Sequence, residues 1–393
     1  MIVDVMHTHA RRVVSHRVAG QERPIADLWL LGSVLLLLTL GLVMVYSASV
    51  STAYEASGNS SHFVVRHGIH MLIGLGCMLL VMHTRVRHWQ SAGPYLLIFG
   101  LVLLIAVLIP GIGARINGSS RWINAGLMMI QPSEFVKIFM VVYVAGYLVR
   151  RQDILTLFVP GILRVSAVVA VAGMLLLQEP DLGTVVVICI TVLSMLFLAG
   201  VRFWHFMLVV GAGIGGMVLL TLISPYRLGR VVGFMDPFAD PFNTGFQLVQ
   251  ALIAFGRGEW LGVGLGASIQ KLSYLPAAHT DFLLAVMAEE LGLVGVVSVI
   301  TLFAIVVFRG LTLARRAELA GHLYAARLAQ GISLLIGSQA LINMGVNMGL
   351  LPTKGLTLPF MSYGGSSMVA CCIAVGLLLM VERELNSKEW ERR

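Results

Sequence analysis

Long apolar runs without charge are the dominant pattern along the chain. Leu28–Tyr46, Pro94–Pro110 and Leu182–Gly200 are about 17 to 19 residues each, close to the roughly 20 that a helix needs to cross a bilayer. A soluble protein could bury one such run in its core, but hardly a series of them. The pattern therefore predicts a bundle of membrane-spanning helices.

Ten spans can be placed, and short loops join nearly all of them. The predicted spans are Leu28–Tyr46, Phe63–Met82, Pro94–Pro110, Ser133–Val149, Ile162–Leu177, Leu182–Gly200, Phe203–Ser224, Phe282–Phe308, Leu328–Leu351 and Gly365–Val381. We expect an all-α, polytopic membrane protein with one membrane domain at 28–381 and tails at 1–27 and 382–393. The exception among the loops is the long segment 225–281, between the seventh and eighth spans.

Composition supports lipid as the solvent. Of 393 residues, 58% are hydrophobic and only 12% are charged, whereas soluble domains carry about a quarter charged residues. The net charge is +8, but the basic residues are scattered among short loops and form no basic face, so nucleic acid is not an expected partner. The cysteines fall inside apolar runs without metal-ligand spacing, and we interpret them as packing residues.

Orientation follows from where Lys and Arg gather in short loops. The basic segments are the N-terminal tail, the loops near Arg85, Arg150, Arg202 and Arg309, and the C-terminal tail. Because cytoplasmic loops are enriched in Lys and Arg, both termini of this multi-pass protein are predicted to be cytoplasmic. The segments 111–132, 178–181, 225–281 and 351–364 then face outward. They hold most of the unusual polar residues, so function is expected at the outer face.

The long outer segment is rich in aromatic residues and glycines. It is therefore expected to pack against the bundle, with a short amphipathic helix near Thr244–Phe255. Its Gly262, Gly264 and Gly266 do not form a nucleotide-binding loop, because no strand precedes them and no Lys-Ser/Thr follows.

Asp281 stands where the long outer segment re-enters the membrane, after His279 and Thr280. A carboxylate at this boundary is partly desolvated, which raises its pKa and makes it a better base. Asp is also a favoured helix N-cap. Position alone leaves both interpretations open.

Charged residues inside spans cost at least about 2.5 kcal/mol each, so they usually pair or mark a functional path. Glu134 and Lys137 lie three residues apart on one helical face, which fits a structural ion pair as well as a substrate contact. Glu289 and Glu290 are adjacent and cannot both face one partner, so one of them is expected to serve structure.

Further candidates lie in the outer loops. Arg121 and Trp122 precede the fourth span, where Trp could equally be an interfacial anchor. Glu179 lies in a tight outer turn whose Asp181 could cap the next helix. The outer cations that could hold an anionic ligand, with solvated loop charge as the alternative, are Arg227, Arg230, Lys271 and Lys354.

Taken together and in order, several segments resemble the SEDS family of bacterial cell-wall proteins (shape, elongation, division and sporulation). The segments that carry the resemblance are Asn117–Ile123, Gln131–Phe135, Glu179–Thr184, Asp236–Phe238, Gly262–Lys271, His279–Phe282 with Glu289 and Glu290, Leu351–Lys354 and Ser362–Ser367. The stretches Asn117–Ser120 and Gly264–Lys271 favour the division branch over the elongation branch. Ala277 departs from the family, which often has Glu there.

The resemblance implies a peptidoglycan glycosyltransferase that polymerises lipid II, with Asp281 at the family's essential acidic position. Inverting transfer requires a base near the acceptor hydroxyl and stabilisation of the leaving pyrophosphate by cations, for which a divalent ion such as Mg²⁺ or Mn²⁺ is one candidate. Expected partners are a class B penicillin-binding protein transpeptidase and other division membrane proteins, at the division septum. The residues expected to contact substrate are Arg121, Trp122, Glu134, Lys137, Glu179, Arg227, Arg230, Lys271, Glu289 and Lys354.

Two alternative functions remain open at this level. A transporter that flips lipid II would suit ten spans with intramembrane charges, although alternating access should place distinctive residues on both faces, and here they crowd one. A division scaffold is a third reading, but the polar tails are too short for elaborate binding domains.

Overall fold

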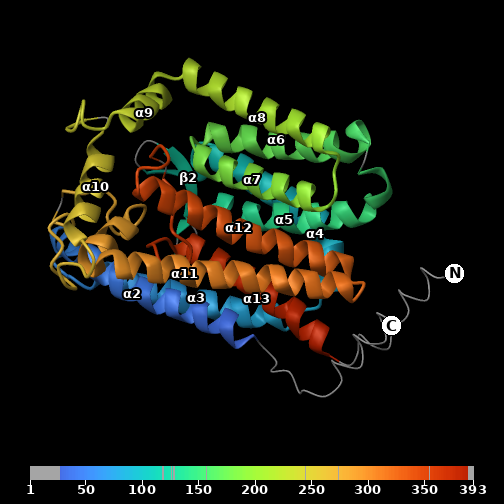
Figure 1. The fold of residues 1–393 in the computed structure, drawn as a ribbon, viewed down its shortest axis with the longest axis horizontal. Coiled ribbons are helices and arrows are strands. Elements are labelled where there is room, and N and C mark those ends of the chain that lie inside the picture. The colour runs from blue at the N-terminus through green and yellow to red at the C-terminus, as the bar shows by residue number, and fades with distance from the viewer. Residues whose placement is uncertain are drawn as a thin grey trace.

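The computed structural model describes residues 27–116, 119–124, 126, 129–155, 157–243, 245–272, 274–353 and 355–387. They form an elongated bundle whose long helices run roughly along one axis (Figure 1). Within these ranges, nine helices are long and apolar enough to cross a membrane, and a shorter apolar helix at Leu182–Leu198 makes ten. The ten predicted spans and the all-α membrane fold are confirmed.

The spanning helices lie at the predicted runs, but several of them extend further. They are α2 (Leu28–Ser57), α3 (His62–Met82), α4 (Val86–Leu108), α5 (Pro132–Arg150), α6 (Arg164–Gln178), α7 (Leu182–Leu198), α8 (Phe203–Ile223), α11 (Leu283–Leu319), α12 (Leu323–Asn347) and α13 (Gly365–Asn386). Helices α2 and α11 run 11 residues past their predicted C-terminal ends, and α4 begins eight residues earlier than predicted. A short 3₁₀ turn at Gln152–Ile154 and a π-helical turn at Phe158–Leu163 lead into α6.

The outer segments are more ordered than plain loops. Segment 111–132 contains a three-stranded antiparallel sheet of β1 (Gly113–Ile116), β2 (Ser119–Asn124) and β3 (Met129–Ile130), which the sequence did not predict. The long segment between α8 and α11 contains α9 (Pro225–Met235) and α10 (Phe246–Gly258). Helix α10 corresponds to the predicted amphipathic helix near Thr244–Phe255; Thr244 itself lies outside the described residues.

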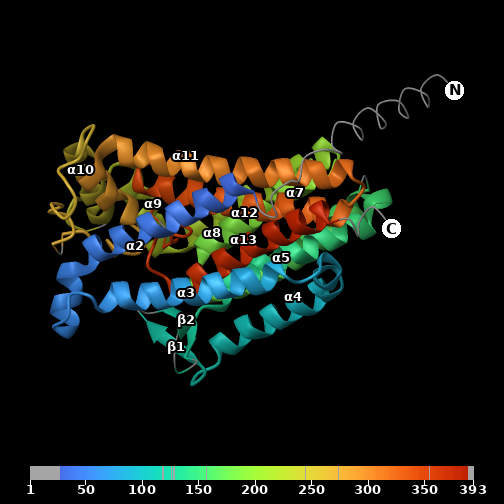
Figure 2. The same cartoon turned by 90° about the horizontal axis from the view of Figure 1, so that it is seen from below.

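The two ends of the bundle differ in what they carry. The sheet, α9 and α10 gather at one end (Figures 1 and 2). At the other end the start of α2 meets the end of α13, since the Asp27 amide donates to Glu382 Oε2 at 2.7 Å and Arg309 of α11 pairs with Asp27. An even number of spans places both ends of the described chain on one side.

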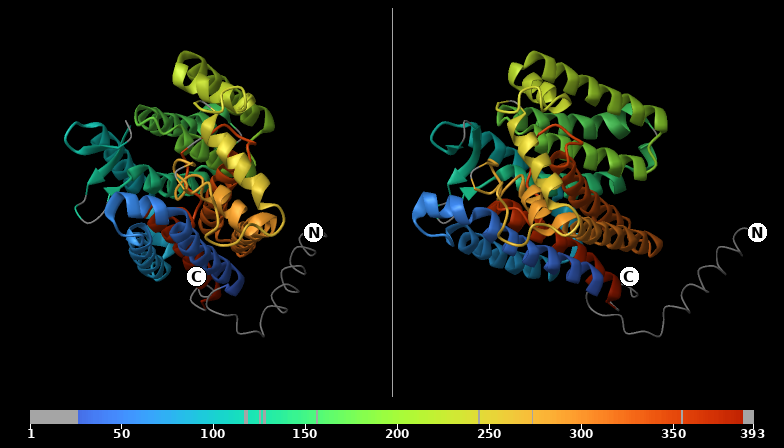
Figure 3. Two further views of the ribbon diagram at one scale, coloured as in Figure 1. Left: turned by 90° about the vertical axis from the view of Figure 1, so that its left-hand side faces the viewer. Right: turned by 60° about the vertical axis from the view of Figure 1, so that its left-hand side comes forward.

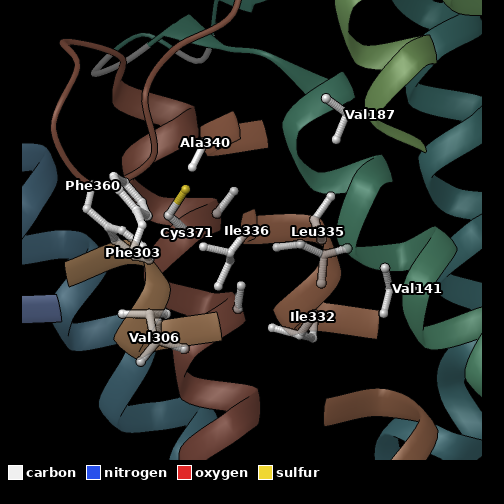
Figure 4. Close-up of a cluster of buried hydrophobic side chains, with 14 of the residues drawn as sticks. Val141, Val187, Phe303, Val306, Ile332, Leu335, Ile336, Ala340, Phe360 and Cys371 are labelled. Carbon is white, nitrogen blue, oxygen red and sulfur yellow. The ribbon is translucent and has the colours of Figure 1, made fainter. Parts of the chain in front are cut away.

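Helices α5, α12 and α13 form the centre of the bundle. Apolar side chains of α5, α7, α11 and α12, including Val141, Val187, Phe303 and Leu335, meet in one buried cluster (Figure 4). Small residues permit this close approach, as expected for helices packed in lipid. A β-carbon at Gly331 of α12 would lie 2.6 Å from Cγ1 of Val141, so α12 and α5 could not pack this closely with a larger residue there.

Helix α8 differs from the others because it lies at the rim of the bundle (Figure 3). Its described residues include none that is buried, and its main helix neighbours are α7 and α9, with one ring contact from His205 to Phe158. An apolar helix with so little protein contact is expected to be surrounded mainly by lipid.

Helix α11 is broken near its N-terminal end. Gly292 has φ 65° and ψ −164°, outside helical geometry. The N–H groups of Leu293 and Val294 donate instead to the Glu259 and Trp260 carbonyls, at 2.9 and 3.2 Å. In return, the carbonyls of Glu289 and Glu290 accept from the outer segment's Val263 and Gly264. The long outer segment is therefore bonded into the break, leaving a short helix of about two turns directly after Asp281.

Candidate functional site

Asp281 lies at the end of the bundle that carries the sheet, two residues before α11. Its peptide oxygen accepts from two α12 side chains, Asn343 Nδ2 at 3.0 Å and Asn347 Nδ2 at 2.9 Å. The cap of α11 is Phe282 and no side chain caps the helix, so Asp281 does not act as an N-cap. The residue as a whole is partly exposed, and its Oδ2 faces Gly355, where a β-carbon would lie 3.2 Å away.

Charged groups converge on this carboxylate from three other segments. Burial raises the pKa of Asp281 from 3.8 to about 6, Arg121 and Arg230 lower it, and Asp181 raises it. Arg121 of β2 is held by the carbonyls of Glu179 at 2.8 Å and Pro180 at 2.6 Å. Arg230 of α9 donates to the Thr353 carbonyl at 3.2 Å. The result is a carboxylate near two guanidinium groups, with a pKa that suits a general base.

Glu179 and Asp181 occupy the turn between α6 and α7 and behave differently. Asp181 caps α7 as predicted, accepting from Thr184 N at 3.3 Å and Thr184 Oγ1 at 2.8 Å. Glu179 is fully buried, and neither carboxylate oxygen has a hydrogen-bond partner among the described residues. Burial, and next the Asp181 charge, raises the pKa of Glu179 to about 8, while Arg121 lowers it. Glu179 is therefore mainly protonated at neutral pH.

Glu134 and Lys137 form the predicted ion pair, buried within the bundle. Lys137 Nζ lies 2.9 Å from Glu134 Oε2 and 2.6 Å from Oε1 of Gln339 on α12. The Gln339 amide in turn donates to the Thr357 carbonyl at 3.1 Å. This chain of contacts ties α5 and α12 to the outer segment that runs past Asp281.

Glu289 and Glu290 both hold the long outer segment, each through different partners. Glu289 accepts from the amides of Ile269 at 3.1 Å and Gln270 at 3.3 Å. Glu290 Oε1 lies 2.8 Å from Lys271 Nζ, which also donates to Ser47 Oγ at 3.0 Å. The two adjacent carboxylates therefore face different partners, as predicted. Both of them, and not only one, bind groups that hold the structure together.

The sequence candidates thus fall into separate groups. Arg121 and Arg230 act on the Asp281 carboxylate, and Glu179 lies beside Arg121. Lys271 and Glu289 instead join the outer segment to α11, and the Glu134–Lys137 pair lies within the bundle. Trp122 is partly buried on β2 beside Arg121. Lys354 lies outside the described residues, as does the side chain of Arg227 on α9.

Asn343, Asn347 and Gln339 are contributors that the sequence reading missed. They lie four residues apart on one face of α12, within an otherwise apolar span. Polar residues repeated every four positions are unusual in a membrane span, so this spacing could have identified that face of α12 as a candidate.

A divalent cation was one candidate for stabilising the leaving pyrophosphate. Among the described residues, no group of three or more His, Cys, Asp or Glu side chains could hold a metal ion. Asp281, Glu179 and Asp181 are therefore not arranged as a ready set of ligands, and a divalent cation stays a prediction.

The fold and this site define a class: ten-span membrane proteins with carboxylates and arginines gathered at one end of the bundle. A family model described as "Cell cycle protein" (FTSW_RODA_SPOVE) matches residues 28–387. The chain belongs to this family, which is the SEDS family that its motifs resemble.

Curated relatives cover nearly the whole chain. A protein of Nitrosococcus halophilus named "Probable peptidoglycan glycosyltransferase FtsW" is 52% identical over 380 residues, covering 96% of this chain and 98% of its own. One of the same name from Thioalkalivibrio sulfidiphilus is 49% identical over 373 residues, covering 94% and 93%. The chain is therefore FtsW-like within its family.

Solved structures share the fold. One, described as "Structural coordination of polymerization and crosslinking by a peptidoglycan synthase complex", has a TM-score of 0.75 at 28% identity and covers 92% of this chain and 98% of its own. The rod shape determining protein RodA of Thermus thermophilus has a TM-score of 0.68 at 26% identity, covering 91% and 97%.

Proposed function

We propose that this protein is a peptidoglycan glycosyltransferase that polymerises lipid II at the outer face of the inner membrane during cell division. The relatives' names support the reaction. The observation that carries the proposal is Asp281, a partly exposed residue whose carboxyl pKa is raised to about 6 by burial and which lies near Arg121 and Arg230. A base and two cations are the groups that inverting glycosyl transfer needs.

In the proposed step the acceptor sugar hydroxyl attacks the donor's anomeric carbon. The hydroxyl proton passes to Asp281, the new glycosidic bond forms, and the bond to the donor pyrophosphate breaks. A carboxylate with a pKa of about 6 is largely ionised at neutral pH and more basic than an ordinary Asp. The Asn343 and Asn347 amides position it by holding its peptide oxygen.

The leaving polyprenyl pyrophosphate carries the negative charge that must be stabilised. Arg121 donates two N–H groups to the carbonyls of Glu179 and Pro180, which fixes the position of the guanidinium. Its remaining N–H groups can donate to phosphate oxygens. Arg230 adds a second positive charge near Asp281. Glu179, mainly neutral at pH 7, does not repel an anion there.

We further propose a class B penicillin-binding protein as partner, with both termini in the cytoplasm and the protein at the septum. The structural neighbour described as a complex of polymerisation and crosslinking supports a transpeptidase partner. The clustering of the polar site at the end opposite Asp27 and Glu382 supports an outward-facing site.

Polymerisation of purified lipid II by the full chain, with its transpeptidase partner, tests the proposal. Wild type is expected to build glycan strands, and Asp281→Asn is expected to lose at least about a hundredfold in rate, in line with removal of a general base. The matched control is Asp153→Asn, an exposed Asp in the 3₁₀ turn at the other end of the bundle.

Normal strand synthesis by Asp281→Asn would rule out this base. A second assay, lipid II flipping in liposomes, separates the transporter alternative. Flipping by wild type and by Asp281→Asn alike, without strand synthesis by either, would favour a transporter instead.

A further inference from the structure

The outer end of α3 carries an arginine and two histidines that the proposed mechanism does not use. Arg66 lies in the second turn of the helix, followed by His67 and, one turn on, His70. Arg66 is exposed, and none of the ion pairs among the described residues includes it. It lies near Tyr363: burial raises the pKa of that phenol, and the Arg66 charge lowers it. A guanidinium within a span is costly without an anionic partner, and its planar donors match phosphate.

The N-terminus of α13 lies against this face of α3. The helix begins at Gly365 after Gly364, and no side chain caps it. The hydroxyls that could have done so are engaged elsewhere, since Ser366 Oγ accepts from Gln131 N at 2.9 Å and Ser367 Oγ pairs with Thr357 at 2.7 Å. Uncapped N-terminal amides and the positive end of the helix dipole favour an anion.

The two histidines supply a separate sign of a missing ligand. His67 is 0% exposed, yet neither ring nitrogen has a hydrogen-bond partner among the described residues. Its ring centroid lies 6.1 Å from that of Tyr363, just before α13. His70 has an unpartnered Nδ1, and its Nε2 would lie 2.9 Å from a β-carbon at Gly365. Unsatisfied buried donors cost about 1–3 kcal/mol each, which a bound ligand would recover.

This position is connected to the Asp281 segment. The Tyr363 amide donates to the His279 carbonyl at 3.0 Å, and the His279 ring lies 4.8 Å from Phe63 and 5.6 Å from Tyr363, centroid to centroid. One layer of rings therefore separates Arg66 from the segment that carries Asp281. Arg121 and Arg230, by contrast, act on Asp281 directly.

We propose that Arg66, the α13 N-terminus and the imidazoles of His67 and His70 form a second anion-binding position, which holds the phosphate groups of a polyprenyl-linked substrate. The inference rests on the proposed function, because transfer between two lipid-linked sugars brings two pyrophosphates to the site. One lies with Arg121 and Arg230, and the other lies here. The phosphate of a bilayer phospholipid shares this chemistry, so the test must separate the two sources.

Native mass spectrometry of the full chain in phosphatidylcholine nanodiscs, with added undecaprenyl pyrophosphate as probe, counts the bound molecules. Wild type is expected to hold two per chain. Arg66→Gln is expected to hold one, with the Kd of the lost site raised at least about tenfold, or about 1.4 kcal/mol. His67→Phe, which keeps a ring against Tyr363, is expected to weaken the same site severalfold.

Two controls accompany the count. Arg87 is an exposed arginine at the start of α4, and Arg87→Gln should still hold two probes. Arg66→Lys keeps the positive charge and should retain the second probe with a higher Kd. If Arg66 had a purely structural role, the Lys and Gln variants would not differ according to charge.

Three results would overturn the inference: two probes on Arg66→Gln, a single probe on wild type, or loss of the second probe when phosphatidylglycerol replaces phosphatidylcholine. The last would identify the position as a phospholipid site. Because the count involves no turnover, it can fail while Asp281→Asn still abolishes polymerisation, and the reverse also holds.

Discussion

The pH dependence of polymerisation should follow the ionisation of Asp281. Burial raises the pKa of this carboxyl to about 6, with Asp181 adding to the shift and Arg121 and Arg230 opposing it. A base must be ionised to accept a proton, so the rate is expected to rise with pH. At a pKa of about 6, roughly a tenth of the carboxyl is ionised at pH 5 and roughly nine-tenths at pH 7, which predicts about a tenfold increase in kcat/KM.

Replacing Arg230 changes the position of this rise in a direction that the structure fixes. Arg230 lowers the pKa of Asp281, so Arg230→Gln should raise that pKa and move the ascending limb to higher pH. The overall rate should fall as well, since a cation beside the pyrophosphate is lost. The Arg87→Gln variant, altered at the far end of α4, should leave the midpoint unchanged.

The assay is initial-rate polymerisation of lipid II between pH 5 and 8, at constant ionic strength and subsaturating substrate. Two outcomes would refute the reasoning. A midpoint near 4 would mean that the carboxyl is not desolvated in the working enzyme. A midpoint that stays in place or moves down in Arg230→Gln would mean that Arg230 does not act on Asp281.

Three further changes test the surrounding framework. Lys137→Met should lower stability by about 3–5 kcal/mol, because it leaves the Glu134 carboxylate buried without its partner, and pairing it with Glu134→Gln should restore much of the thermal unfolding midpoint. Asn347→Leu should lower kcat with little change in the KM for lipid II, since it removes one of the two side-chain hydrogen bonds that hold the peptide oxygen of the base. Gly262→Ala should destabilise the outer segment, measurable as faster proteolysis, because its β-carbon would lie 2.2 Å from an α11 carbonyl oxygen; Gly211→Ala, in open space on α8, should have no such effect.

The spans could be predicted because the signal for each is local. A run such as Leu28–Tyr46 must be helical in lipid wherever it packs, since its backbone has no other hydrogen-bond partners there. The sheet was missed because β1, β2 and β3 are short, and their pairing depends on contacts between separate segments. The break at Gly292 was missed for the same reason: its backbone partners lie about 30 residues earlier.

The candidate site was only partly accessible from sequence. Asp281 could be identified from its place at the membrane boundary and from the family motif around it. The sequence could not decide whether Asp281 caps the helix, whereas the structure gives Phe282 as the cap of α11. The structure was also needed to separate the charged residues near Asp281 from those that hold the outer segment. Glu289 and Arg121 look equally suitable in the sequence, yet one binds backbone amides of the outer segment and the other approaches Asp281.

The interruption of α11 also bears on how bilayer thickness acts on catalysis. Beyond Gly292 the helix still has about 27 residues, roughly 40 Å at 1.5 Å per residue, which exceeds the hydrocarbon core on its own. The short stretch that precedes the break can therefore sit at headgroup height, and the lipid-facing part of the helix sets how far Asp281 stands above the acyl chains. A thinner or thicker bilayer would change the height of the base relative to sugars anchored by their own lipid tails, making membrane thickness a physical variable of the reaction.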